Sequence, residues 1–223
     1  VVNDRLKLEN LKASIFGGTL RGHADISIRK AAGDYSAAVF TENVDFPSLT
    51  RLYFGYDTSK GKMSSSFAFT GLHDWVKAIS GTGSITVTDG NVFAIPIFGP
   101  FSSILDTILP GSGYNDARKG ACTFEMRDGV VSTRDLVMEG KGFSIYGEGK
   151  LFIPDDKMNF TARINAQGIP GKLLSPVSRI FEYISDGSLS KPVWRPKIVP
   201  KMIWFAPRGL PPAVGGEPEP SAR

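Results

Sequence analysis

The chain has 223 residues, of which 41% are hydrophobic, 25 are glycine and 15 are proline. This length allows one large β domain or two small ones with a buried core, and the many turn-forming residues favour an all-β architecture over a helical bundle. The formal charge of +4 is smaller than the five cations of the acid-free stretch 187–216, so the rest of the chain is nearly neutral, which disfavours a general polyanion-binding role.

The first 80 residues predict four strands and one helix. Alternating apolar residues on both sides of Gly17-Gly18 predict a strand, a turn and a second strand, and further strands are expected at 35–40 and 63–70. Between these last two, Asp45 is a candidate N-cap and Gly55 a stop signal, so this segment is predicted to be a short helix.

The central stretch 81–109 combines two predicted strands with a helix. Alternation over 84–88 predicts a half-buried strand that ends at the turn pair Asp89-Gly90. We expect a second, more apolar strand from Val92 to Ile95, ended by a proline. Helical spacing of apolar residues then predicts a short amphipathic helix over 100–109.

The remaining chain continues the alternation and ends in a third predicted helix. Strands are expected around 122–126, 136–138, 143–153 and 160–166, and an amphipathic helix over 170–184. The chain is therefore predicted to be mainly β over 1–190: a curved antiparallel sheet, groove-like, curled or sandwich-like, with about three short helices. Recurring Asp-Gly turns and Gly-x-Gly entries suggest two irregular repeats, 1–80 and 81–190.

The C-terminal part differs in composition. Residues 191–208 mix cations, aromatic residues and prolines without a regular period, so we expect an extended segment along a sheet edge or another surface. Its candidate contacts with an anionic membrane surface or a partner protein are Trp194, Arg195, Lys197, Lys201 and Trp204. Residues 209–223 are rich in Pro, Gly, Ser and Glu, and we expect them to be disordered.

Patterns typical of catalysis are weak. His23 and His73 lack a metal-ligand spacing, and the single cysteine, Cys122, has no neighbouring base and is expected to pack as an apolar side chain. Gly81-Thr82-Gly83 precedes a strand and does not open a helix, which argues against a dinucleotide site. Most carboxylates lie at turns. We therefore expect a protein that is not an enzyme, with no catalytic residue, metal, cofactor or nucleic-acid partner.

The apolar faces have two interpretations. They form an ordinary closed core, or a curved sheet leaves an apolar groove open for acyl chains, with the helices as lids; periodicity alone does not separate the two. For the groove, the candidate lining is Phe93, Ile95, Phe101, Ile104, Leu105, Phe143 and Ile145.

An ordered series of motifs runs over about residues 60–195. It comprises Gly81-x-Gly83-x-Ile85-x-Val87-x-Asp89-Gly90-x-Val92, Ile95-Pro96, Phe124-x-Met126-x-Asp128-Gly129-Val130, Gly147-Glu148-Gly149 and Gly187-Ser188-Leu189-x-x-Pro192. The series resembles the C-terminal region of AsmA-like proteins, a family with TamB-like relatives. The resemblance implies a β-rich periplasmic part of a Gram-negative envelope protein, tethered to the inner membrane by an N-terminal helix that this chain lacks.

The same resemblance implies a function. Such a protein binds or conducts phospholipid through an apolar β groove, in outer-membrane lipid transport and envelope biogenesis, and the family has no catalytic motif. The alternative is a structural docking module that caps the groove and recruits an envelope partner or a membrane surface, a hypothesis motivated by residues 191–208. No apolar run reaches the roughly 18 residues of a spanning helix, so no membrane-crossing helix is expected within the chain.

Overall fold

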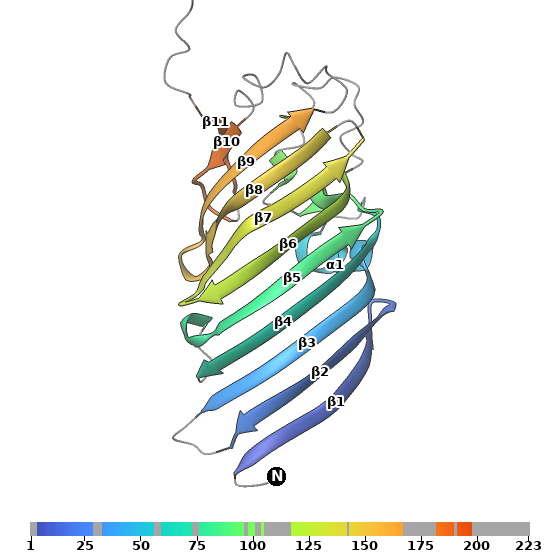
Figure 1. The fold of residues 1–223 in the computed structure, drawn as a ribbon, viewed down its shortest axis with the longest axis vertical. Helices are drawn as coiled ribbons and strands as arrows, with labels where there is room; N and C mark the ends of the chain where they lie inside the picture. Colours follow the sequence, from blue (N-terminus) through green and yellow to red (C-terminus); the bar gives the residue numbers. More distant parts are fainter. Residues whose placement is uncertain are drawn as a thin grey trace, which may run out of the picture.

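The computed structural model describes residues 4–28, 33–55, 59–72, 76–95, 98–100, 104, 117–141, 143–166, 182–189 and 191–197. Within this part, eleven antiparallel strands form one open sheet, and each strand pairs with its neighbours in the sequence (Figure 1). The strands are β1 (Arg5–Ile15), β2 (Gly18–Ser27), β3 (Asp34–Asp45), β4 (Lys62–Leu72), β5 (Ser80–Thr88), β6 (Ala117–Arg127), β7 (Val130–Gly140), β8 (Phe143–Phe152), β9 (Lys157–Ala166), β10 (Glu182–Ser185) and β11 (Trp194–Pro196). The prediction of a mainly β, antiparallel sheet is confirmed.

Two-residue turns set the register of two hairpins. Phe16 and Gly17 join β1 to β2 with φ values of 45° and 69°, and Asp128 and Gly129 join β6 to β7 with 53° and 75°. Positive φ at both central residues is the geometry of a type I′ turn, whose twist matches that of the flanking strands. The turn predicted from the Asp128-Gly129 pair is therefore confirmed.

The predicted helix at 45–55 is confirmed as α1 (Phe46–Phe54), which lies behind the sheet in Figure 1. Asp45 caps its start, because its Oδ2 accepts hydrogen bonds from the Ser48 amide at 3.1 Å and from the Ser48 hydroxyl at 2.7 Å. Gly55 ends it in the left-handed conformation, and its amide donates to the Arg51 carbonyl.

The prediction of about three helices is not confirmed. Of the expected helix at 100–109, Pro100 and Ile104 are helical, and the other positions lie outside the described residues. The prediction of a helix over 170–184 is wrong at its C-terminal end, because 182–185 form strand β10. Pairing with β9 satisfies backbone groups at what would otherwise be a free sheet edge, and this long-range effect outweighs the local helical spacing. Residues 170–181 lie outside the described part.

The strand expected from Val92 to Ile95 is also wrong, because Val92–Ala94 form the 3-10 turn η2. The Asn91 side chain accepts a hydrogen bond from the Phe93 amide at 3.1 Å and starts the turn. Both Val92 and Phe93 are buried in this turn. Within the described residues, the other short 3-10 turns are η1 (Val76–Ala78) and η4 (Ile153–Asp155).

One face of the sheet carries the core. Val92, Phe93, Ile95 and Phe98, together with Phe46 at the start of α1, pack onto the apolar face of β5 and β7–β9. The strand residues enclosed there include Val87, Met138, Phe143, Ile145 and Ile164. Val92 lies directly over Gly120, where an added Cβ would come within 2.7 Å of its Cγ2, so this close packing requires a glycine.

Candidate functional site: the open apolar face

The apolar face continues beyond the core, over β1–β4 and the adjoining ends of β5 and β6. Among the described elements, β1, β2 and β4 make their main contacts with neighbouring strands, and Met63 at the start of β4 also packs against the enclosed core. Half-buried side chains from several strands share this side of the sheet. We name the following set the open apolar face: Leu6, Leu8, Leu20, Ala24, Ile26, Tyr35, Val39, Phe67, Phe69 and Phe124.

An aromatic strip crosses the open apolar face from β3 to β6. The Tyr35 ring meets Phe69 edge-on with centroids 6.3 Å apart, and Phe69 stacks on Phe67 at 4.7 Å. Phe67 and Phe124 approach to 5.4 Å across β5. The strip therefore extends from β3 to β6, with rings from β3, β4 and β6 that meet across β5.

Glycines make room for these rings. Gly83 lies opposite both Phe67 and Phe124 in the strand register, and a Cβ there would come within 2.4 Å of the Phe124 ring. Gly71 lies in the same way beside Tyr35. Because glycine has no side chain, each ring can lie over the neighbouring strand, which keeps the face broad and continuous.

The open apolar face is predominantly apolar and carries no charged side chain in its defined set. Its main polar side chains are Thr41 and Ser65, which satisfy one another because their hydroxyl oxygens are 2.8 Å apart. The charges of the same strands alternate onto the other face, where Arg5 pairs with Asp25 and Asp34. The hydrogen bonds from Arg5 lower the pKa of Asp34. The open face can therefore bury hydrocarbon but offers no ionic contact.

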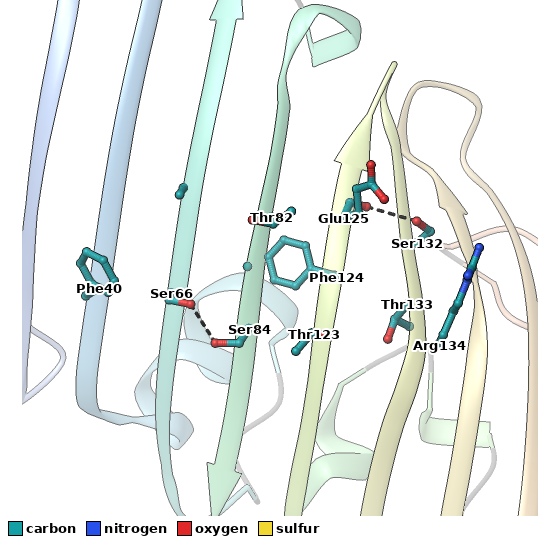
Figure 2. Close-up of a pocket in the computed structure, with 12 residues that line it drawn as sticks. Phe40, Ser66, Thr82, Ser84, Thr123, Phe124, Glu125, Ser132, Thr133 and Arg134 are labelled. Atoms are coloured by element: carbon teal, nitrogen blue, oxygen red, sulfur yellow. Dashed lines mark hydrogen bonds between the residues drawn. The ribbon is translucent and has the colours of Figure 1, made fainter.

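The opposite face carries a shallow hydroxyl-lined depression of about 580 Å³, shown in Figure 2. Ser66 and Ser84 bond to one another at 2.8 Å, and Phe40 stands at its border. Arg134 and Glu125 are its charged residues, and neither histidine nor cysteine lines it. These described lining residues therefore contain no nucleophile paired with a base.

The structure places the described candidate groove residues next to the open apolar face and not in it. Phe93, Phe143 and Ile145 are buried in the enclosed core, where the Phe93 and Phe143 rings stack. Ile95 and Ile104 are partly buried against this core. Phe101 and Leu105 lie outside the described residues.

Three of the candidate membrane or partner contacts in residues 191–208 are described, and each of them contacts residues at the edge of the sheet. Trp194 in β11 is buried and packs edge-on against Phe160, with centroids 6.2 Å apart. Arg195 pairs with Asp186, and Lys197 Nζ lies 2.8 Å from Glu182 Oε1. Lys201, Trp204 and residues 209–223 lie outside the described part.

Sequence reasoning missed the aromatic strip, although it predicted the strand at 63–70 that carries Phe67 and Phe69. The missing signal was the cross-strand register that brings Tyr35 and Phe124 beside them. Register depends on pairing between distant segments, so periodicity within one strand does not reveal it.

The described part contains one cysteine, Cys122, and one histidine, His23. Burial, with a smaller effect of the Asp135 carboxylate, raises the pKa of Cys122 to about 11, which keeps the thiol protonated. His23 is exposed on the polar face. Within the described ranges, no group of three or more His, Cys, Asp or Glu side chains could hold a metal ion, and no helix has the length and apolar character needed to cross a membrane.

No known family, curated protein or solved structure matches this chain.

Proposed function

We propose that the chain binds phospholipid acyl chains on the open apolar face, as the periplasmic part of an AsmA-like protein in outer-membrane lipid transport and envelope biogenesis. The observation that carries the proposal is an uncharged apolar surface that continues across consecutive strands beyond the enclosed core. The resemblance of the motif series to AsmA-like proteins supports the cellular setting.

The dimensions suit a hydrocarbon chain. Neighbouring strands are about 4.8 Å apart, so a path from β1 to β5 is about 19 Å long. One leaflet contributes about 15 Å to the hydrocarbon core of a bilayer. Each methylene removed from water on such a path contributes about 0.8 kcal/mol, which makes burial of the chain the driving force.

This mode of binding predicts weak headgroup selectivity. The open apolar face contributes no charged side chain, so a phosphate or amine would stay at its border in water. Phospholipids with different headgroups and the same acyl chains should therefore bind with similar affinity.

The first test is the lipid content of the protein purified without detergent. We expect phospholipid at roughly one molecule per chain in organic extracts analysed by mass spectrometry. Replacing Phe67→Thr and Phe69→Thr together removes two central rings while keeping β-forming residues, and should reduce bound phospholipid several-fold. Phe40→Thr is the matched control, since Phe40 is exposed on the opposite face of the sheet and should leave lipid content unchanged.

A folded wild-type protein without phospholipid, or a folded double variant with undiminished phospholipid, would contradict the proposal. Circular dichroism and urea unfolding establish that each variant is folded. Absence of lipid would favour the alternative, a structural module that docks to an envelope partner.

A further inference from the structure

Helix α1 presents two neighbouring apolar side chains to solvent. Leu52 is 63% exposed and Tyr53 is 67% exposed, the largest values among the exposed large hydrophobic residues of the described part. Phe46 and Thr50, in the earlier turns of the same helix, are fully buried, and Phe46 belongs to the core. The exposed pair is therefore not needed to attach α1 to the sheet.

The helix holds this pair in a fixed position. Asp45 and Gly55 cap its two ends, and Thr50 makes a short hydrogen bond to Ser59 in the segment that follows. The Phe46 amide donates to the Gly61 carbonyl at 3.1 Å. The backbone that carries the pair therefore loses little conformational freedom when a partner buries the two side chains.

Unpaired cations gather at the same end of the sheet. Gly61 adjoins Gly90, and the Gly90 amide donates to the Arg118 carbonyl, so the chain entering β4 and the start of β6 meet beside α1. The side chains of Arg51, Lys60 and Arg118 are exposed and have no ion-pair partner among the described residues.

Acidic groups at this end do not cancel these charges. Asp45 is occupied by Lys62, which lies 3.1 Å away, and by the Ser48 cap. Asp89 is the exposed described acid beside Gly90. In the sequence, Asp57 follows α1 but lies outside the described residues. Among the described residues named here, exposed cations therefore outnumber exposed acids at this end of the sheet.

We propose that this α1 surface, formed by Arg51, Leu52, Tyr53, Lys60 and Arg118, docks on an anionic phospholipid bilayer. Leu52 and the Tyr53 ring enter the boundary between headgroups and acyl chains, a region that suits an aromatic ring with a polar end. The cations face the lipid phosphates, an attraction that falls off within a Debye length of the surface. The α1 surface is separate from the open apolar face, so the docking does not depend on acyl-chain binding.

Vesicle flotation tests the docking. We expect the wild-type protein to float with vesicles of phosphatidylglycerol and phosphatidylcholine, to bind pure phosphatidylcholine vesicles far less, and to lose binding as salt is raised. Leu52→Ser with Tyr53→Ser should weaken binding to the anionic vesicles about tenfold. Arg51→Ser with Lys60→Ser should weaken binding and reduce its salt dependence.

The matched control is Ile28→Ser with Val193→Ser, which removes two apolar side chains that are 50% and 62% exposed elsewhere on the molecule. This variant should bind like the wild type. The docking proposal is overturned if the wild-type protein does not bind anionic vesicles, or if the variant with Leu52→Ser and Tyr53→Ser binds them as well as the control variant does. Bound phospholipid, measured on the same variants, should be unchanged, so failure of docking and failure of acyl-chain binding are distinguishable.

Discussion

Asp135 stabilises a place where two strands lose their regular pairing. The β6 and β7 register shifts between Ala121 and Glu125, and β7 bulges at Asp135 against β8. The carboxylate accepts hydrogen bonds from the Thr123 amide at 2.8 Å, from the Thr123 hydroxyl at 2.6 Å and from the Thr133 hydroxyl at 3.1 Å. It therefore substitutes for a missing backbone partner. These hydrogen bonds lower the pKa of Asp135.

Asp135→Ala should destabilise the fold by about 1 kcal/mol at pH 7, because the Thr123 amide loses its acceptor. The folded-state pKa lies below the ordinary value, so the contribution is present above pH 4 and is lost as the pH falls through the folded pKa. Urea midpoints should differ between wild type and variant at pH 7 and converge in acid. Glu148→Ala, at an exposed position of the same face, is the control; a difference that persists in acid would contradict the assignment.

Gly83 illustrates a glycine required by close approach. A Cβ at this position would lie 2.4 Å from the Phe124 ring and 2.4 Å from the Ser66 carbonyl oxygen. Gly83→Ala should therefore cost about 1–3 kcal/mol through overpacking, measured by urea unfolding. Gly99→Ala is the control, since its nearest neighbour would be 3.7 Å away. Equal stability of the two variants would show that the rings do not need this gap.

At the scale of elements, β11 closes the C-terminal edge of the sheet despite its short length. Lys197 reaches Glu182 in β10 at 2.8 Å, and Arg163 in β9 lies 3.7 Å from the same carboxylate. Trp194 adds an aromatic contact with Phe160. The three-residue strand β11 is thus held against the sheet by the buried Trp194 ring and by the ion-pair network of the adjoining Lys197.

Trp194→Ala should destabilise the protein by about 3 kcal/mol, because it leaves a cavity beside Phe160. Val193→Ala is a close control, since the neighbouring Val193 side chain is exposed and should contribute little. Urea unfolding gives the free energies, and limited proteolysis reports release of the segment after β10. Equal midpoints for the two variants would mean that Trp194 does not secure this edge.

At the scale of the whole molecule, one continuous sheet has two different environments on its apolar face. Val92, Phe93, Phe98 and the start of α1 enclose Phe143 and Ile145, whereas Phe67 and Phe124 lie beyond this cover. The proposed acyl-chain site and the α1 surface are therefore separate parts of one framework. The simple strand order, each strand beside its sequence neighbours, is what keeps the face continuous.

The sequence by itself determined the β class, the alternating faces, the Asp128-Gly129 hairpin and α1, because these follow from local periodicity, turn chemistry and capping. Tertiary structure decided the turn at Val92, the strand at 182–185 and the difference between enclosed Phe143 and half-buried Phe124. Each of these depends on segments distant in the chain. Cross-strand register and the covering of a face are long-range contacts, and a pattern within one segment carries no information about them.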